Sequence, residues 1–109
     1  MPNDGLLELT WGDGEHTFAL TIPLIRELEE KTGSGPLAIM SRLSDGTWKV
    51  DDVRETIRLD LIGGGKTPVE ALKLVQGYLD SRPIAENLPA AIAIIGHALF
   101  GRRLAEVEG

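Results

Sequence analysis

The chain has 109 residues and a formal net charge of −6, and 42% of its residues are hydrophobic. This composition is typical of one globular domain and argues against a disordered chain. The acidic balance argues against binding to nucleic acid or to an anionic membrane, since both need clustered Lys and Arg. Because the chain has no cysteine, disulfide bonds and thiolate metal sites are excluded.

The chain begins with Met-Pro-Asn-Asp-Gly, which has neither the basic nor the apolar region of a signal peptide. The most apolar stretch, residues 88–100, is shorter than the roughly 20 residues that a spanning helix needs. We therefore expect no membrane segment.

The first 22 residues alternate between apolar and polar side chains, a pattern typical of half-buried strands. The apolar positions are Leu7, Leu9, Trp11, Phe18, Leu20 and Ile22. Between the two runs lies Gly12-Asp13-Gly14-Glu15, whose Asp-Gly pair is predicted to supply the positive-φ positions of a tight turn. We predict an antiparallel hairpin whose apolar face packs on helices, because a lone hairpin is only marginally stable.

Two helices are predicted next. Pro23 suits the first turn of one helix, which Gly33 ends, and Pro36 begins another, which Gly46 stops. Their apolar positions are Leu24, Ile25, Leu28, Leu37, Ile39, Met40 and Leu43. Trp48 follows in a polar connector, where it either closes the core or anchors a partner, and we favour the core.

A third helix is predicted to begin with Asp51 as its N-cap and to end at Gly63-Gly64-Gly65. Val53, Ile57 and Leu61 form its buried stripe. Its solvent side is expected to carry Asp52, Arg54, Glu55 and Arg58.

A fourth helix begins at Thr67-Pro68-Val69-Glu70, which has the pattern of a capping box, and stops at Arg82-Pro83. Its predicted buried positions are Val69, Leu72, Val75 and Leu79. The last helix is predicted from Pro89 to about Leu104 and is apolar on two faces, at Ala91, Ile92, Ile94, Ile95, Ala98 and Leu99. Such a helix is either central to the fold or partly reserved for a partner, and we favour the central position.

These elements predict an α+β fold, a single domain over residues 1–109 in which an N-terminal β-hairpin packs against about five α-helices. The sequence contains no internal repeat.

The segment from Gly63 to Thr67 is similar to the end of a phosphate-binding loop, but Asp60 occupies the place of the first glycine. That loop must also follow a buried strand, whereas the preceding residues have helical spacing. His16 and His97 lie far apart, and no metal-binding histidine spacing occurs. We therefore predict a protein that is not an enzyme, with no catalytic residue, cofactor or metal.

The order of several segments resembles the gene-transfer-agent family of small phage-tail proteins, over nearly the whole chain. They are residues 20–30, Leu61-Ile62-Gly63-Gly64-Gly65, Glu70-Ala71, Leu74-Val75, Arg82-Pro83-Ile84-Ala85-Glu86-Asn87 and Ala98-Leu99-Phe100-Gly101. Members of this family are described as tail assembly chaperones and have also been labelled tail tube proteins.

The resemblance implies a chaperone in the cytoplasm of the bacterial host that binds the tape-measure protein, the tail tube protein, or both. It leaves room for weak self-association. The alternative is a structural tail subunit that stays in the particle. A third interpretation, independent of the resemblance, is an acidic regulatory module that binds a basic partner.

The last helix is our predicted partner surface. It ends in apolar and basic residues, and aromatic and Arg side chains are common anchors of protein interfaces. The candidate partner-binding residues are Ile94, Leu99, Phe100, Arg102 and Arg103. The competing interpretation places Phe100 in the core beside Phe18 and Trp11.

Overall fold

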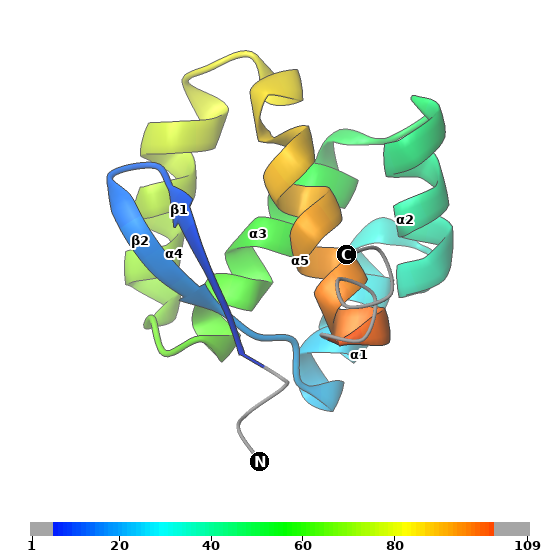
Figure 1. The fold of residues 1–109 in the computed structure, drawn as a ribbon, viewed down its shortest axis with the longest axis horizontal. Coiled ribbons are helices and arrows are strands. Elements are labelled where there is room, and N and C mark those ends of the chain that lie inside the picture. Colours follow the sequence, from blue (N-terminus) through cyan, green and yellow to red (C-terminus); the bar gives the residue numbers. More distant parts are fainter. Residues whose placement is uncertain (1–5, 102–109) are drawn as a thin grey trace.

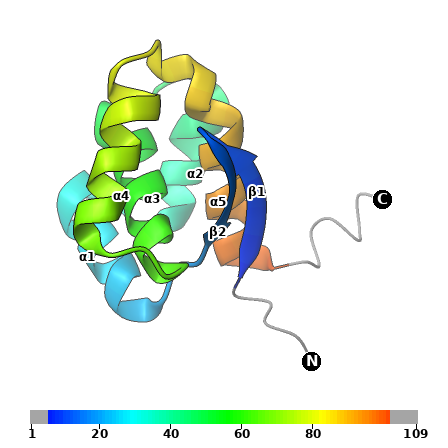
Figure 2. The same ribbon diagram turned by 90° about the vertical axis from the view of Figure 1, so that its left-hand side faces the viewer.

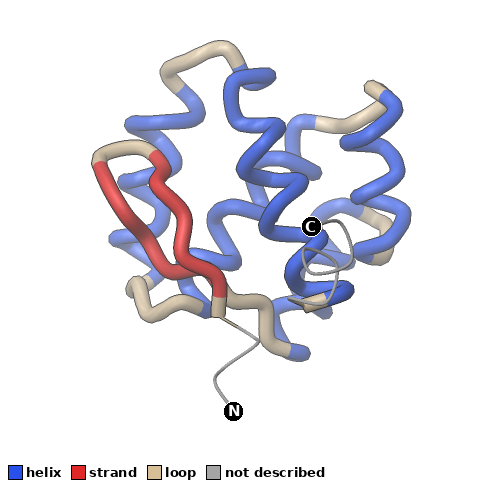
Figure 3. Tube along the Cα trace, in the orientation of Figure 1, coloured by secondary structure: helices blue, strands red, loops and turns tan. Residues whose placement is uncertain are grey.

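The structure is a computed structural model, and it describes residues 6–101 (Figure 1). Within that range a two-stranded sheet is followed by helices, as the sequence predicts (Figure 3). The elements are β1 (Leu7–Trp11), β2 (Gly14–Phe18), α1 (Ile22–Thr32), α2 (Pro36–Asp45), α3 (Val50–Gly63), α4 (Pro68–Val75), the π-helical η1 (Gln76–Asp80), the 3-10 helix η2 (Ile84–Asn87) and α5 (Leu88–Phe100).

Helix α3 occupies the centre of the domain (Figure 2). It contacts α1, α2, α4, α5 and β2. Val53, Ile57 and Leu61 are fully buried, as predicted, and Leu59 on another side of the helix is buried too. Helix α5 packs against α2, α3 and β1, so its two apolar faces are shared among several neighbours. The central helix is thus α3, and α5 lies beside it.

The charged residues of α3 are placed differently from the prediction, which assigned them to the solvent side. Asp52 and Glu55 are buried because each has an arginine partner. Arg42 of α2 donates to Asp52 through Nε at 2.8 Å and through Nη2 at 2.7 Å. Arg58 donates to Glu55 at 2.6 Å through Nη2. Such bidentate pairs compensate for much of the loss of hydration.

The start of α3 also differs from the prediction. Its N-cap is Lys49, not Asp51, and Asp52 occupies the third helical position. The carboxylate of Asp52 accepts a hydrogen bond from the backbone N–H of Lys49 at 2.8 Å. Asp52 therefore satisfies a helix-terminal donor and holds Arg42 at the same time.

The hairpin has the predicted antiparallel pairing, with Leu7 opposite Phe18 and Trp11 opposite Gly14. Its two-residue loop is Gly12–Asp13, so the positive φ of 64° lies at Gly12 and not at Asp13, where it was predicted. The regular strand ends at Phe18, so Ile22 does not belong to the sheet. Ile22 instead begins α1 and is 61% exposed.

Two predicted stripes are only partly correct. On α4 the buried positions are Ala71, Val75 and, in the following η1 turn, Leu79, while Val69 and Leu72 face solvent. These three residues are spaced by four, so this stripe is the buried one. Leu37 of α2 is likewise exposed, one residue after the helix begins.

The predicted helix ends are largely correct. Gly33 and Gly46 end their helices in the left-handed conformation. Thr67 forms the predicted capping box, accepting from the N–H of Glu70 at 3.1 Å. Helix α5 is shorter than predicted because Gly101, with φ of 65°, ends it after Phe100. Leu104, the predicted end, lies outside the described residues.

The end of α3 meets the backbone of the hairpin without any side chain between them. A Cβ atom on Gly63 would overlap the carbonyl oxygen of Ala19, and one on Gly64 would overlap that of Thr17. The Ala19 N–H donates to the carbonyl oxygen of Asp60 at 3.0 Å. Gly65 adopts a positive φ of 119°. The glycine run thus admits β2 against the helix as well as forming a turn.

Alanine at either contact glycine should destabilise the domain. We expect Gly63→Ala and Gly64→Ala each to lower the free energy of unfolding by about 1–3 kcal/mol, because the backbone of β2 must move away. Gly77→Ala is the matched control, since Gly77 is helical and its Cβ would meet nothing within 4 Å. The control should be neutral or stabilising by up to about 1 kcal/mol. Equal urea midpoints for all three variants would contradict the close approach.

The side chain of Asp60 lies in the same region and has no charged partner among the described residues. It is buried, and its Oδ1 atom has no hydrogen-bond partner there. Burial raises the pKa of this carboxyl well above its ordinary value. A raised carboxyl pKa means that the folded state holds the proton more tightly than the unfolded state. The contribution of Asp60 to stability therefore improves as the pH falls through its folded-state pKa.

We expect Asp60→Asn to raise the melting temperature at pH 7 and to lose this advantage in acid, where Asp60 itself is protonated. Asp52→Asn is the opposite control. Burial acts to raise the pKa of Asp52, but Arg42 and the Lys49 N–H outweigh it and hold the pKa below its ordinary value. Asp52 therefore stabilises the fold above its unfolded-state pKa, and this contribution is lost as pH falls. Thermal melts from pH 7 into acid provide the measurement. Relative to the parent protein, the change in melting temperature at pH 7 should have opposite signs for the two variants, and both changes should shrink as the pH falls.

Candidate protein-binding surface

The described residues of the predicted partner surface divide between core and solvent. Ile94 is 1% exposed and belongs to the core, so the prediction that it faces a partner is corrected. Leu99 is half-buried, and Phe100 is 47% exposed. Arg102 and Arg103 lie outside the described residues. Phe100 is therefore the main exposed apolar side chain of the predicted set, and the core interpretation does not hold for it.

Phe100 has two apolar companions at the same end of the molecule. Leu6, just before β1, is 42% exposed, and Ile22 begins α1. The start of β1, the start of α1 and the end of α5 lie toward the same end of the domain in Figures 1 and 2, with α1 on the other side of it from β1 and α5 in Figure 2. We call Leu6, Ile22 and Phe100 the apolar end. Large exposed apolar side chains are candidates for contact with a partner protein.

The sequence pattern did not identify Leu6 or Ile22 as surface residues. Ile22 continues the alternation of the second strand, so it was assigned to the buried face of the hairpin. The available signal was Pro23, because proline in the first helical turn places the residue before it at the helix start. Leu6 carries no such signal.

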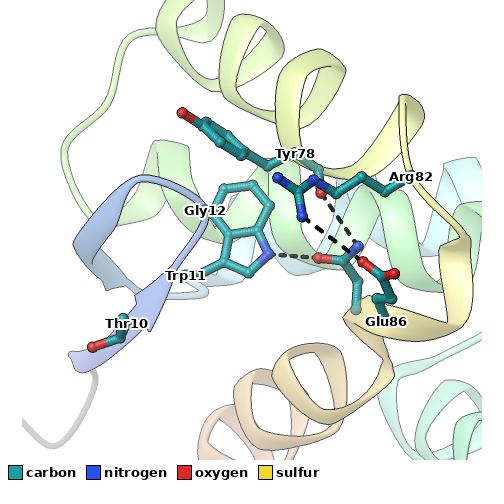
Figure 4. Close-up of a pocket in the computed structure, with 7 residues that line it drawn as sticks. Thr10, Trp11, Gly12, Tyr78, Arg82 and Glu86 are labelled. Atoms are coloured by element: carbon teal, nitrogen blue, oxygen red, sulfur yellow. Dashed lines mark hydrogen bonds and ion pairs between the residues drawn. The ribbon is translucent and has the colours of Figure 1, made fainter.

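A second feature is a small pocket beside the hairpin turn, of about 240 Å³, bordered by Trp11, Tyr78 and Arg82 (Figure 4). The indole N–H of Trp11 donates to Asn87 Oδ1 at 2.6 Å, and Asn87 Nδ2 donates to the carbonyl oxygen of Tyr78 at 3.4 Å. The guanidinium of Arg82 lies 5.9 Å from the centre of the Tyr78 ring and 4.0 Å from Glu86. These contacts tie the hairpin to η1 and η2.

The segments and polar residues considered as possible phosphate-binding or metal-binding groups lie apart in the structure. Residues before Gly63 form α3 and not a strand, so the geometry of a phosphate-binding loop is not formed. His16 contacts Asp13 at 2.7 Å in the hairpin, and His97 lies on α5. Among residues 6–101 no group of three or more His, Asp or Glu side chains is placed to hold a metal ion. In that part of the chain no helix is both long enough and apolar enough to cross a bilayer.

Comparison with known proteins gives one family. Residues 4–101 match the family described as "Phage tail tube protein, GTA-gp10". No curated protein and no solved structure matches the chain. The matched range includes both strands, every helix of the described part, and the apolar end.

Proposed function

We propose that this chain, which belongs to the phage tail tube protein family GTA-gp10, acts in tail assembly as a chaperone that binds another tail protein. The observation that carries this proposal is the apolar end. A domain that left Leu6, Ile22 and Phe100 exposed without a partner would gain nothing from them, since burying each such side chain is worth about 1.5–3 kcal/mol. A client protein that covers them gains this energy.

The small amount of sheet also favours a chaperone. Tail tube subunits usually need a β-barrel or β-sandwich to close a ring, an analogy at the level of fold only. Residues 6–101 hold one two-stranded sheet. The proposed client is the tape-measure protein or the tail tube protein, bound in the cytoplasm of the bacterial host. The role requires protein contacts only and no catalytic group.

A second candidate is a structural subunit that stays in the tail, and the family description favours it because it names a tube protein. Mass spectrometry of purified particles separates the two functions. We expect the protein to be absent from mature particles although its deletion prevents tail formation. If it is as abundant in particles as the major tail proteins, the structural function replaces the chaperone.

We expect Phe100→Ala to keep the free energy of unfolding within about 1 kcal/mol, because the side chain is largely exposed. The same change should weaken binding to the tape-measure or tail tube protein by at least about 2 kcal/mol. Val69→Ala is the matched control, since Val69 is 64% exposed but lies on α4, outside the apolar end. A urea melt and a pull-down with each tail protein provide the two measurements. Equal binding by both variants would remove Phe100 from the interface.

A further inference from the structure

The strand β1 has one edge that pairs with no other described strand. The sheet contains only β1 and β2, so the edge of β1 opposite β2 is unpaired (Figure 3). The two-residue turn makes Trp11 and Gly14 a hydrogen-bonded pair, and the bonding alternates along an antiparallel ladder. Glu8 and Thr10 are therefore in the non-bonded pairs, and their backbone N–H and C=O groups point away from β2. None of these groups bonds to another part of the described chain.

A groove lies directly beside this edge. It has a volume of about 300 Å³ and separates Leu9 and Trp11 of β1 from Ala90 and Ala93 of α5. The two alanines leave it unfilled because their side chains are short. It shares Thr10, Trp11 and Glu86 with the pocket beside the hairpin turn, so the two hollows adjoin along β1. A further strand would lie about 4.8 Å from β1 and would cover the groove.

The opposite face of the hairpin is acidic next to the same edge. Side chains alternate along a strand, so Glu8 and Thr10 face away from Leu9 and Trp11. Glu15 is the cross-strand partner of Thr10 and shares its face. Both glutamates are exposed. A strand added to β1 would thus meet an apolar groove on one face and, on the other, the carboxylate of Glu8 next to it and that of Glu15 one strand further away.

We propose that the free edge of β1 binds an extended segment of the client tail protein that alternates apolar and basic residues. The backbone of the segment pairs with Glu8 and Thr10, its apolar side chains enter the groove, and its Lys or Arg side chains lie beside Glu8, with Glu15 one strand further away. Strand addition of this kind takes affinity from main-chain bonds and specificity from alternate side chains. A second copy of the chain is the weaker occupant, because its own β1 would bring Glu8 against the same carboxylates. Only the identity of the partner rests on the proposed function.

The test uses the full chain and two synthetic hexapeptides with blocked ends, one alternating Val and Lys and one alternating Val and Glu. We expect the Val–Lys peptide to shift the backbone amide signals of Glu8 and Thr10 in NMR titrations. The Val–Glu peptide should bind about tenfold more weakly, because like charges then face each other across the strands. Equal binding of the two peptides, or shifts confined to other amides, would overturn the proposal. So would concentration-dependent shifts of these two amides without peptide, which would assign the edge to a second copy.

Two variants separate this edge from general damage to the fold. Thr10→Pro removes an outward N–H without removing a hairpin bond, and its affinity for the Val–Lys peptide should fall at least about fivefold. Thr10→Val, which keeps the N–H, should bind like the parent. If Thr10→Pro does not fold, Ala93→Phe takes its place by filling the groove from an exposed position. The proposal is overturned if the folded variant, Thr10→Pro or Ala93→Phe, binds the Val–Lys peptide with the affinity of the parent protein. Phe100→Ala should bind this peptide with the parental affinity. An incorrect proposal for the apolar end and an incorrect proposal for the edge of β1 therefore give different results.

Discussion

The direct contact between the backbone of β2 and the end of α3 determines how this domain is put together. Gly63 and Gly64 allow the carbonyl oxygens of Thr17 and Ala19 to approach the helix without intervening side chains. This contact brings the hairpin close enough for Phe18 to enter the core. It also fixes where β1 lies relative to α5, and so the groove beside β1. The apolar end depends on the same contact, because the chain passes from β2 into α1.

Much of the fold could be predicted from the sequence because its signals are local. A glycine after a helical run ends the helix through its own backbone preference, as at Gly33 and Gly46. The capping box at Thr67 and Glu70 needs only residues three apart. The hairpin turn was similarly predictable from its glycines, although the positive φ lies at Gly12 and not at Asp13. Each prediction holds because no distant part of the chain is needed to decide it.

Several of the predictions that were wrong concern features decided by distant partners, whereas the end of α5 at Gly101 is a local signal that was missed. A helix with charges on one side is usually solvated there, but Arg42 lies ten residues before Asp52 and belongs to another helix. Nothing in the local pattern of α3 indicates that pair. The candidate site also depends on distant residues. Phe100 could be predicted from its aromatic side chain, whereas Leu6 and Ile22 are brought to the same end of the domain only by the fold. The groove beside β1 likewise requires two elements that are distant in sequence.

The hydrogen bond from Trp11 to Asn87 joins residues 76 positions apart. A ribosome adds roughly 5–20 residues per second, so the hairpin emerges several seconds before its last partners. During that interval β2 can meet α3, but the side of β1 that faces α5 has no neighbour. The N-terminal strand is therefore the first element made and among the last to complete its packing. Synthesis of α5 is the step that closes the domain.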